Sequence, residues 1–230
     1  MKSSKTIIIV PAYNEEKNIP ALIKNIKEHT NDSQILLIDD GSKDKTSEVA
    51  KTLGATVITH STNRGKGEAL YTAFEWIKKK PFETIIIMDA DLQFSAKDVP
   101  RIERALRLYD FVMGQRNWKN VPFRHRMGNF VWRSLFNLLY GTKLRDTNCG
   151  LIGFRKEIIN KLNVRGGYIV ENMMLSSAIK NKIKIGQVPV DVTYHIIHGV
   201  PRGARVVSGV FFFILKDGLK YRFGRKKSKR

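Results

Sequence analysis

Residues 6–26 read TIIIVPAYNEEKNIPALIKNI, and this stretch predicts how the chain folds. Its first five residues form a β-branched run of the kind found in short buried strands. After a polar turn, apolar residues recur at the spacing of one helical face: Ile19, Leu22, Ile23 and Ile26. Asn14 is the expected N-cap of this helix, because its side chain can accept a backbone amide hydrogen bond. A strand that leads through a polar turn into an amphipathic helix is typical of α/β folds.

The same pattern repeats along the first half of the chain. Further strand-like runs occupy residues 34–38, 56–59 and 84–88, and helical patterns occupy residues 45–53 and 66–79. Strands that alternate with helices predict a mostly parallel sheet covered by helices on both faces. The second half is less regular, with strands expected at 111–114, before Phe154 and at 184–189, and helices at 127–140, 156–162 and 170–180. Because no repeat or Pro/Gly/Ser-rich linker interrupts the chain, we expect one domain.

Polar residues follow three of the predicted strands. Residues 11–14 (PAYN) follow the first strand, Asp39 and Asp40 follow the second, and Asp89 and Asp91 follow the fourth. In open α/β sheets, ligands bind in the loops at the carboxyl ends of the strands. Three polar strand ends at one edge therefore predict a ligand site.

The residue types at these strand ends indicate what the ligand is. Asp89 and Asp91 can share a divalent cation that neutralises a diphosphate, and Gln93 can add a neutral oxygen ligand. A helix cap or a solvated turn is the alternative for an isolated Asp-x-Asp, but the neighbouring strand ends favour the metal site. Asp40 can accept hydrogen bonds from a base or a ribose, while a nearby Ser or Asp caps the next helix. The glycines of residues 63–67 (NRGKG) would let backbone amides approach a phosphate.

The composition is ordinary except for its charge. The chain has 41 Lys and Arg against 21 Asp and Glu, which gives a net charge of +20 and a pI near 10.1. This excess predicts a polyanionic partner: nucleic acid, an anionic membrane surface or a phosphorylated substrate. The single cysteine, Cys149, excludes a disulfide framework and indicates a small buried residue in a reducing compartment. No run reaches the roughly 18 apolar residues of a transmembrane helix, so we expect no membrane span.

Six motifs together identify a family. They are, in chain order, residues 10–16 (VPAYNEE), 38–42 (IDDGS), 63–67 (NRGKG), 88–93 (MDADLQ), 114–116 (GQR) and 146–150 (DTNCG). In this combination the sequence resembles the family 2 glycosyltransferases of GT-A fold, and within them the branch that loads sugars onto dolichyl or other polyprenyl phosphates. The resemblance implies an α/β GT-A catalytic domain over residues 1–205. Its nucleotide-sugar half would span about 1–115, its acceptor half about 116–205, and an amphipathic basic segment would follow at 206–230.

The resemblance also implies a role for each matching residue. The nucleotide sugar would be bound by Pro11, Tyr13, Glu15, Asp39, Asp40, Lys66, Asp89, Ala90 and Asp91. A Mg²⁺ or Mn²⁺ ion would be held by Asp89, Asp91 and Gln93. The phosphates of donor and acceptor would be met by Arg116, Arg126 and Arg202, since the planar guanidinium binds phosphate oxygens in pairs. These arginines, with Asp89 and Asp91, are the expected catalytic residues.

The expected reaction is a metal-dependent, inverting transfer of a hexose to a lipid phosphate. A phosphate monoester is already anionic at pH 7, so it can attack without a general base. Glu171 can act as a base, as the Glu-Asp pair of relatives with alcohol acceptors does. This chain has Glu171 and Asn172 in that place, so we favour a positioning or structural role for Glu171. Residues 201–205 (PRGAR) depart from the Arg-x-x-Gly-x-Ser-Lys pattern of mannosyltransferases, which leaves GDP-mannose, UDP-glucose and UDP-N-acetylglucosamine as alternative donors.

Two further alternatives follow from the motifs and the charge. The acceptor can instead be a growing glycan or a glycolipid. A basic nucleic-acid-binding protein is the alternative class, and the acids at the predicted site disfavour it, so we expect no specific nucleic acid partner.

The C-terminal segment predicts contact with a membrane. Residues 206–215 are largely apolar, and Lys216, Lys220 and Arg222 accompany them, as in helices that lie in a membrane interface. Each cation of the tail at 225–230 would add about 1 kcal/mol of attraction to an anionic bilayer. The alternatives are a final core helix with a disordered tail and a helix covered by a membrane-protein subunit. We expect a peripheral protein on the cytoplasmic face of the cell membrane, without a transmembrane helix.

Overall fold

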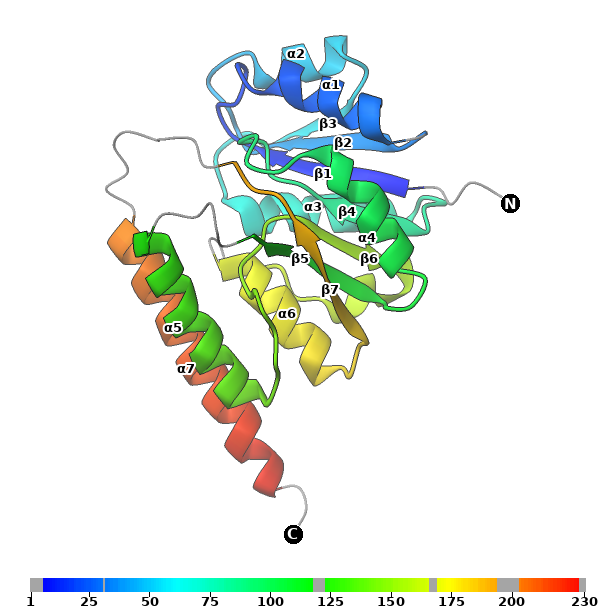
Figure 1. Ribbon diagram of the computed structural model, residues 1–230. Helices are drawn as coiled ribbons and strands as arrows, with labels where there is room; N and C mark the ends of the chain where they lie inside the picture. The colour runs from blue at the N-terminus through cyan, green and yellow to red at the C-terminus, as the bar shows by residue number, and fades with distance from the viewer. Residues whose placement is uncertain (1–5, 31, 118–122, 166–168, 194–202, 228–230) are drawn as a thin grey trace.

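The computed structural model describes residues 6–30, 32–117, 123–165, 169–193 and 203–227. Seven strands form one sheet in the order β3-β2-β1-β4-β6-β5-β7 (Figure 1). Only β6 runs antiparallel, between β4 and β5, so the described sheet is mostly parallel, as predicted. The strands are β1 (Thr6–Ala12), β2 (Gln34–Asp39), β3 (Thr56–Thr59), β4 (Thr84–Ile87), β5 (Phe111–Arg116), β6 (Ile152–Arg155) and β7 (Ile185–Val190).

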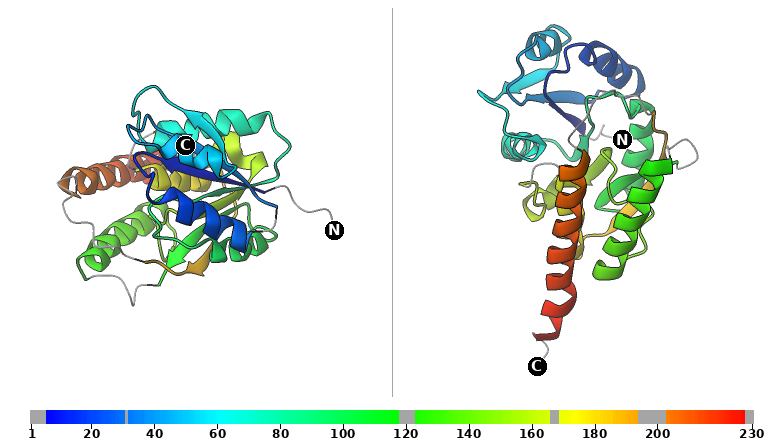
Figure 2. Two further views of the ribbon diagram at one scale, coloured as in Figure 1. Left: turned by 90° about the horizontal axis from the view of Figure 1, so that it is seen from above. Right: turned by 90° about the vertical axis from the view of Figure 1, so that its left-hand side faces the viewer.

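Helices cover both faces of this sheet. In Figures 1 and 2, α1 and α4 lie on one face and α3 lies on the other. The helices are α1 (Ile19–His29), α2 (Thr46–Thr52), α3 (Lys66–Lys78), α4 (Val99–Ala105), α5 (Phe123–Tyr140), α6 (Val170–Lys180) and α7 (Gly203–Lys227). Two short 3₁₀ segments, η1 (Ala96–Asp98) and η3 (Lys156–Lys161), complete the described elements. This arrangement confirms the predicted α/β class.

The sheet interior explains the apolar runs of the sequence. Ile7, Ile8, Ile9 and Val10 of β1 are each at most 1% exposed. A central parallel strand is covered on both faces, so its residues are continuously apolar instead of alternating with polar ones. Full burial of such a side chain contributes about 1.5–3 kcal/mol, which makes the central strands the rigid support of the loops that follow them.

The first helix begins later than its pattern suggested, so the predicted N-cap at Asn14 is wrong. Helix α1 starts at Ile19, and Asn14 lies in the left-handed region at φ 57°. Asn tolerates this conformation better than most residues because its side chain is short and polar. The Asn14 backbone amide donates to Ser42 Oγ at 2.9 Å, and its Oδ1 accepts from the Lys43 amide at 2.8 Å. The turn after β1 is therefore bonded to the turn after β2.

Helices α5 and α7 lie side by side at one side of the sheet, and the C-terminal part of α7 projects beyond the body (Figures 1 and 2). A Cβ atom at Gly218 would lie 2.7 Å from the Leu139 Cβ, so this glycine permits the close approach of the two helices. The predicted C-terminal helix is thus present. None of the described helices combines the length and the apolar character that a membrane span requires.

Candidate active site

The ends of β1, β2 and β4 bring their following loops to one cavity of about 420 Å³. The loop before α3 and the first turns of α3 complete its wall. The lining residues are Pro11, Ala12, Tyr13, Glu15, Asp40, Asn63, Gly65, Lys66, Ala69, Asp89, Ala90 and Asp91. Because parallel strands deliver their loops to the same edge, residues far apart in the sequence meet here, where such sheets bind their ligands.

The structure gathers every residue predicted to bind the nucleotide sugar except Asp39. Asp39 is 2% exposed, and its carboxylate accepts hydrogen bonds from the Ser42 backbone amide at 2.9 Å and from the Ser47 hydroxyl. These contacts stabilise the turn that leads into α2. Of these two adjacent acids, Asp40 is the one that lines the cavity.

Lys66, the first residue of α3, brings a positive charge to the cavity wall. Its Nζ lies 2.5 Å from Asp89 Oδ1 and 2.5 Å from Glu171 Oε1. Burial alone would lower the pKa of Lys66, but the two carboxylates raise it above its ordinary value, so the ammonium stays charged. Lys66 thereby joins α3, the end of β4 and the first turn of α6 across the site.

Among the described residues that line this cavity, acids outnumber cations, although the chain is strongly basic. Burial raises the pKa of Asp89 to about 6; Lys66 opposes this rise, and the carboxylates of Glu171 and Asp91 add to it. Burial likewise raises the pKa of Glu15, and the neighbouring Asp89 is among the acids that raise it further. Crowded carboxylates of this kind gain from a bound cation, which would offset their mutual repulsion.

Asp89 and Asp91 fit a Mg²⁺ or Mn²⁺ ion, because both line the cavity and both offer carboxylate oxygens. Asp91 Oδ1 also accepts the backbone amide of Gln93 at 3.1 Å, which orients the Asp91 side chain. Gln93 itself is not among the lining residues, and the described residues contain no cluster of three His, Cys, Asp or Glu that could hold a metal. One or two carboxylates combined with substrate phosphates are the usual way in which proteins hold Mg²⁺.

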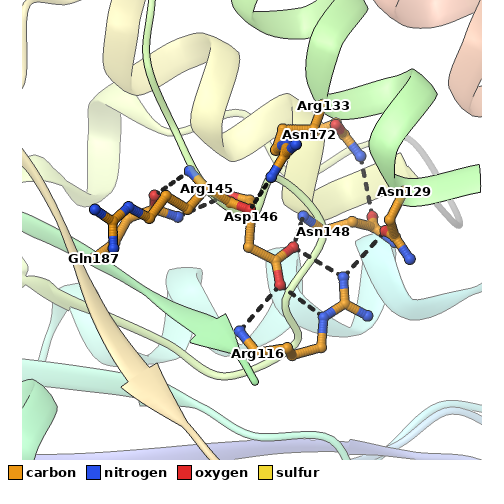
Figure 3. A network of polar contacts seen from close by, with 8 residues as sticks. All are labelled: Arg116, Asn129, Arg133, Arg145, Asp146, Asn148, Asn172 and Gln187. Carbon is orange, nitrogen blue, oxygen red and sulfur yellow. Dashed lines mark hydrogen bonds and ion pairs between the residues drawn. The ribbon is translucent and has the colours of Figure 1, made fainter. Parts of the chain in front are cut away.

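Arg116, at the end of β5, is bound by a protein carboxylate (Figure 3). Its Nε donates to Asp146 Oδ2 at 2.7 Å, and one terminal nitrogen donates to Asp146 Oδ1 at 2.8 Å and to Asn129 Oδ1 at 3.2 Å. Arg116 is 8% exposed and Asp146 is 1% exposed. This buried bidentate pair ties β5 to residues 146–150 and to α5. Of the other predicted arginines, Arg126 is exposed on α5, and Arg202 lies outside the described residues.

Residues 146–150 pack against the predicted metal ligands. A Cβ atom at Gly150 would lie 2.1 Å from Asp89 Oδ2, so a larger residue would have to displace that carboxylate. The Asn172 side-chain amide donates to Asn148 Oδ1 at 3.1 Å, which connects this segment to α6. Burial raises the pKa of the Cys149 thiol, in agreement with the prediction of a buried, unreactive residue.

Two features of the site were not predicted from the sequence: His60 and the partners of Arg116. His60 follows β3, and its ring contacts Asp40. Its place directly after a predicted strand of a parallel sheet could have indicated that it lies near the ligand site. The contacts of Arg116 with Asp146 and Asn129 have no local signal, because they join residues 30 and 13 positions away.

Comparisons with known proteins agree with this geometry. The family model described as Glycosyl transferase family 2 matches residues 7–162. A UDP-N-acetylglucosamine–dolichyl-phosphate N-acetylglucosaminyltransferase from Methanococcus voltae is 29% identical, over 90% of this chain and 92% of its own length. A polyprenol monophosphomannose synthase from Mycolicibacterium smegmatis is 23% identical, over 97% of this chain and 90% of its own length.

The fold itself matches solved structures. Glucosyl-3-phosphoglycerate synthase from Mycobacterium tuberculosis, in complex with Mn²⁺, uridine diphosphate and phosphoglyceric acid, superposes with a TM-score of 0.78 at 20% identity. The match covers 94% of this chain and 79% of that one, and it shows the GT-A fold. Because the family match also spans more than half of the chain, this protein belongs to the family 2 glycosyltransferases and is a glycosyltransferase.

Proposed function

We propose that this enzyme moves a sugar from a nucleoside diphosphate sugar to dolichyl phosphate or another polyprenyl phosphate. The observation that carries the proposal is the cavity at the strand ends, which Asp89, Asp91 and Lys66 line and where Lys66 forms an ion pair with Asp89. The Methanococcus voltae relative is named for UDP-N-acetylglucosamine and dolichyl phosphate, and the Mycolicibacterium smegmatis relative for polyprenol monophosphomannose. The donors to test are therefore UDP-N-acetylglucosamine, GDP-mannose and UDP-glucose.

The chemistry of the acceptor explains why no protein base is needed. A divalent cation held by Asp89 and Asp91 would supply positive charge to the leaving diphosphate. An oxygen of the anionic acceptor phosphate attacks the anomeric carbon, the bond from that carbon to the nucleoside diphosphate breaks, and the configuration inverts. Glu171 holds the Lys66 ammonium at 2.5 Å and acts as a positioning residue. Catalysis then comes from alignment and from stabilisation of the leaving charge.

The arginines divide into two kinds. Arg116 binds Asp146 in two parallel hydrogen bonds, so we assign it to shaping the acceptor side. Arg126 is exposed on α5, where it can meet the phosphate of a lipid acceptor.

Helices α5 and α7 form the proposed membrane-facing surface. Large apolar side chains on them are exposed: Met127, Phe130, Val131, Leu138, Phe211, Phe212, Leu219 and Phe223. An apolar group of this size on one helix pair indicates an interaction surface. Exposed Lys216, Lys220 and Arg222 on α7 favour an anionic bilayer on the cytoplasmic side. We propose residues 1–205 as the catalytic domain and 206–230 as the attachment segment; α7, which begins at Gly203, crosses this boundary. A membrane-protein subunit is the alternative cover.

A transfer assay with radiolabelled donors tests this function. Each donor is offered with dolichyl phosphate and Mn²⁺ or Mg²⁺, with EDTA as a control, and label should enter the organic phase with one donor and only with metal. Asp91→Asn should abolish transfer. Asp32→Asn removes the same charge at an exposed position with φ 56°, which Asn tolerates, and should keep activity. Nucleotide binding without transfer to the lipid, or transfer to a glycan instead, would contradict the proposed acceptor.

A further inference from the structure

His60 is a buried polar residue directly after β3, at the edge where the ligand cavity forms. Its side chain is 6% exposed, and its backbone amide donates to the Asp39 carbonyl oxygen at 2.8 Å. Both ring nitrogens have partners: Nδ1 lies 2.7 Å from Asp40 Oδ1, and Nε2 lies 2.8 Å from the Thr72 hydroxyl on α3. The ring therefore connects the end of β2 to α3, and the chemistry described above makes no use of it.

The two partners define the orientation of the ring. An ionised carboxylate only accepts hydrogen bonds, so a neutral His60 must carry its proton on Nδ1 to bind Asp40. Nε2 is then an acceptor, and the Thr72 hydroxyl is its donor. A ring bonded on both sides cannot turn without losing a buried hydrogen bond, which holds His60 in one position.

Asp40 has little acceptor capacity left after its protein contacts. Its carboxylate accepts hydrogen bonds from the His60 ring, from the Arg64 backbone amide at 3.0 Å and from the Gly65 backbone amide at 2.6 Å. A carboxylate offers about four acceptor positions, so about one remains for a ligand. Asp40 lines the cavity, whereas His60 is not among the lining residues. The direction of the remaining position therefore depends on how the protein holds the carboxylate.

The backbone around Asp40 cannot easily adjust to re-aim it. A Cβ atom at Gly41 would lie 2.5 Å from the Thr62 carbonyl carbon, so the turn after β2 is packed against the loop before α3. Gly65 closes that loop at φ 91°, a conformation that other residues rarely adopt. The Arg64 amide contacts both oxygens of Asp40, the Gly65 amide contacts Oδ2, and the His60 ring is the side-chain contact that holds Oδ1.

We propose that His60 is a positioning residue for donor binding, which holds the Asp40 carboxylate so that its remaining acceptor position meets an N–H or O–H group of the nucleoside. This inference rests on the proposed function, because it takes the cavity to be the nucleotide site. His60 acts through Asp40 and does not touch the reacting atoms. Its loss should therefore weaken donor binding and leave the chemical step unchanged.

Two substitutions separate the role of each ring nitrogen. In His60→Asn the side-chain amide can take the place of Nδ1 and still donate to Asp40, whereas in His60→Gln the amide lies nearer to the position of Nε2. Calorimetric titration with UDP and with GDP in Mn²⁺ should show a rise in Kd of about tenfold for His60→Gln and less than about threefold for His60→Asn. Donor KM should rise in parallel, with kcat and acceptor KM unchanged. The exposed His29 provides the matched control, and His29→Gln should leave the nucleotide Kd and the donor KM unchanged.

Equal losses in the two His60 variants, or a fall in kcat at constant donor KM, would overturn the assignment. If His60→Gln does not fold, Thr72→Val removes only the hydrogen bond to Nε2 and should raise Kd about threefold. An unchanged Kd in folded Thr72→Val would also overturn it. Wild-type enzyme that binds neither nucleotide would contradict the proposed function itself, whereas binding that His60→Gln leaves intact contradicts only the role of His60.

Discussion

Replacing Asp217 with Asn should loosen the attachment of α7 to the rest of the enzyme. The Asp217 carboxylate on α7 accepts hydrogen bonds from the Tyr140 hydroxyl of α5 at 2.5 Å and from the Ser176 hydroxyl of α6 at 2.6 Å. The Lys180 ammonium of α6 lies 2.5 Å from its other oxygen. Three helices therefore meet at one carboxylate. Asn has the same size, but it lacks the charge and turns an N–H donor toward groups that are themselves donors.

The expected loss follows from these contacts. A hydrogen bond to a charged group contributes about 1.5–3 kcal/mol to the free energy of unfolding. Asn keeps one acceptor oxygen, and water screens the charge of Lys180, whose side chain is 38% exposed. We therefore expect a net loss of about 2 kcal/mol, mainly from the buried hydroxyls of Tyr140 and Ser176. In a protein of this size that corresponds to about 4–8 °C in Tm.

The pH dependence has a definite sign. Burial raises the pKa of Asp217, but the hydrogen bonds from Lys180, Ser176 and Tyr140 outweigh it and leave the pKa below its ordinary value. A carboxyl group with a lower pKa in the folded protein stabilises the fold above its unfolded pKa of about 3.9. This contribution is lost as the pH falls through the folded pKa. The Tm difference between wild type and Asp217→Asn should thus be complete at pH 7 and shrink below about pH 4.

Scanning calorimetry of both proteins at neutral and acidic pH measures this effect, with Asp32→Asn as the control for a lost surface charge. A Tm difference below about 1 °C at pH 7 would refute the estimate. A difference that persists unchanged at about pH 3 would show that the charge of Asp217 is not its cause.

Three further predictions concern the site and the proposed membrane surface. Gly150→Ala should remove most transfer activity, because the new Cβ, 2.1 Å from Asp89 Oδ2, must displace a proposed metal ligand; a wild-type kcat would contradict this. Lys66→Met should tighten the binding of Mn²⁺ to the nucleotide-free enzyme several-fold, because the Asp89 carboxylate loses its ion pair with Lys66. Calorimetry that shows unchanged or weaker Mn²⁺ binding would contradict this prediction. Phe212→Asp, at a side chain 65% exposed on α7, should reduce co-sedimentation with anionic vesicles without changing nucleotide binding. The control is Leu108→Asp, because Leu108 is 67% exposed and lies outside the helix pair. An equal loss of vesicle co-sedimentation in both variants would argue against a specific membrane-facing surface.

Local patterns were sufficient to predict the sheet and the place of the cavity. The apolar run of β1 predicted a strand buried on both faces, and its residues are at most 1% exposed from Ile7 to Val10. Asp40, Asp89 and Asp91 follow β2 and β4, and parallel topology brings such strand ends to one edge. Periodicity and strand–helix alternation are properties of neighbouring residues, so the sequence alone contained them.

Particular side-chain partners could not be predicted, because they depend on how distant segments pack. Asn14 was expected to cap a helix, but its hydrogen bonds with residues 42 and 43 hold it in the turn after β1. The ion pair of Arg116 with Asp146 was not predicted, because it depends on the packing of residues 146–150 against β5. Lys66 and Glu171 lie 105 positions apart, and only the meeting of α3 with α6 makes them an ion pair.

Charge shows the same division between sequence and structure. The composition determined that the protein carries +20 and should attract polyanions. It did not show that acids would outnumber cations among the described residues of the cavity wall, where Asp89 and Asp91 line the cavity together with Lys66. Net charge is a sum over the whole chain, whereas the potential at a site depends on distance and burial, and both are set only when the strands and helices have packed.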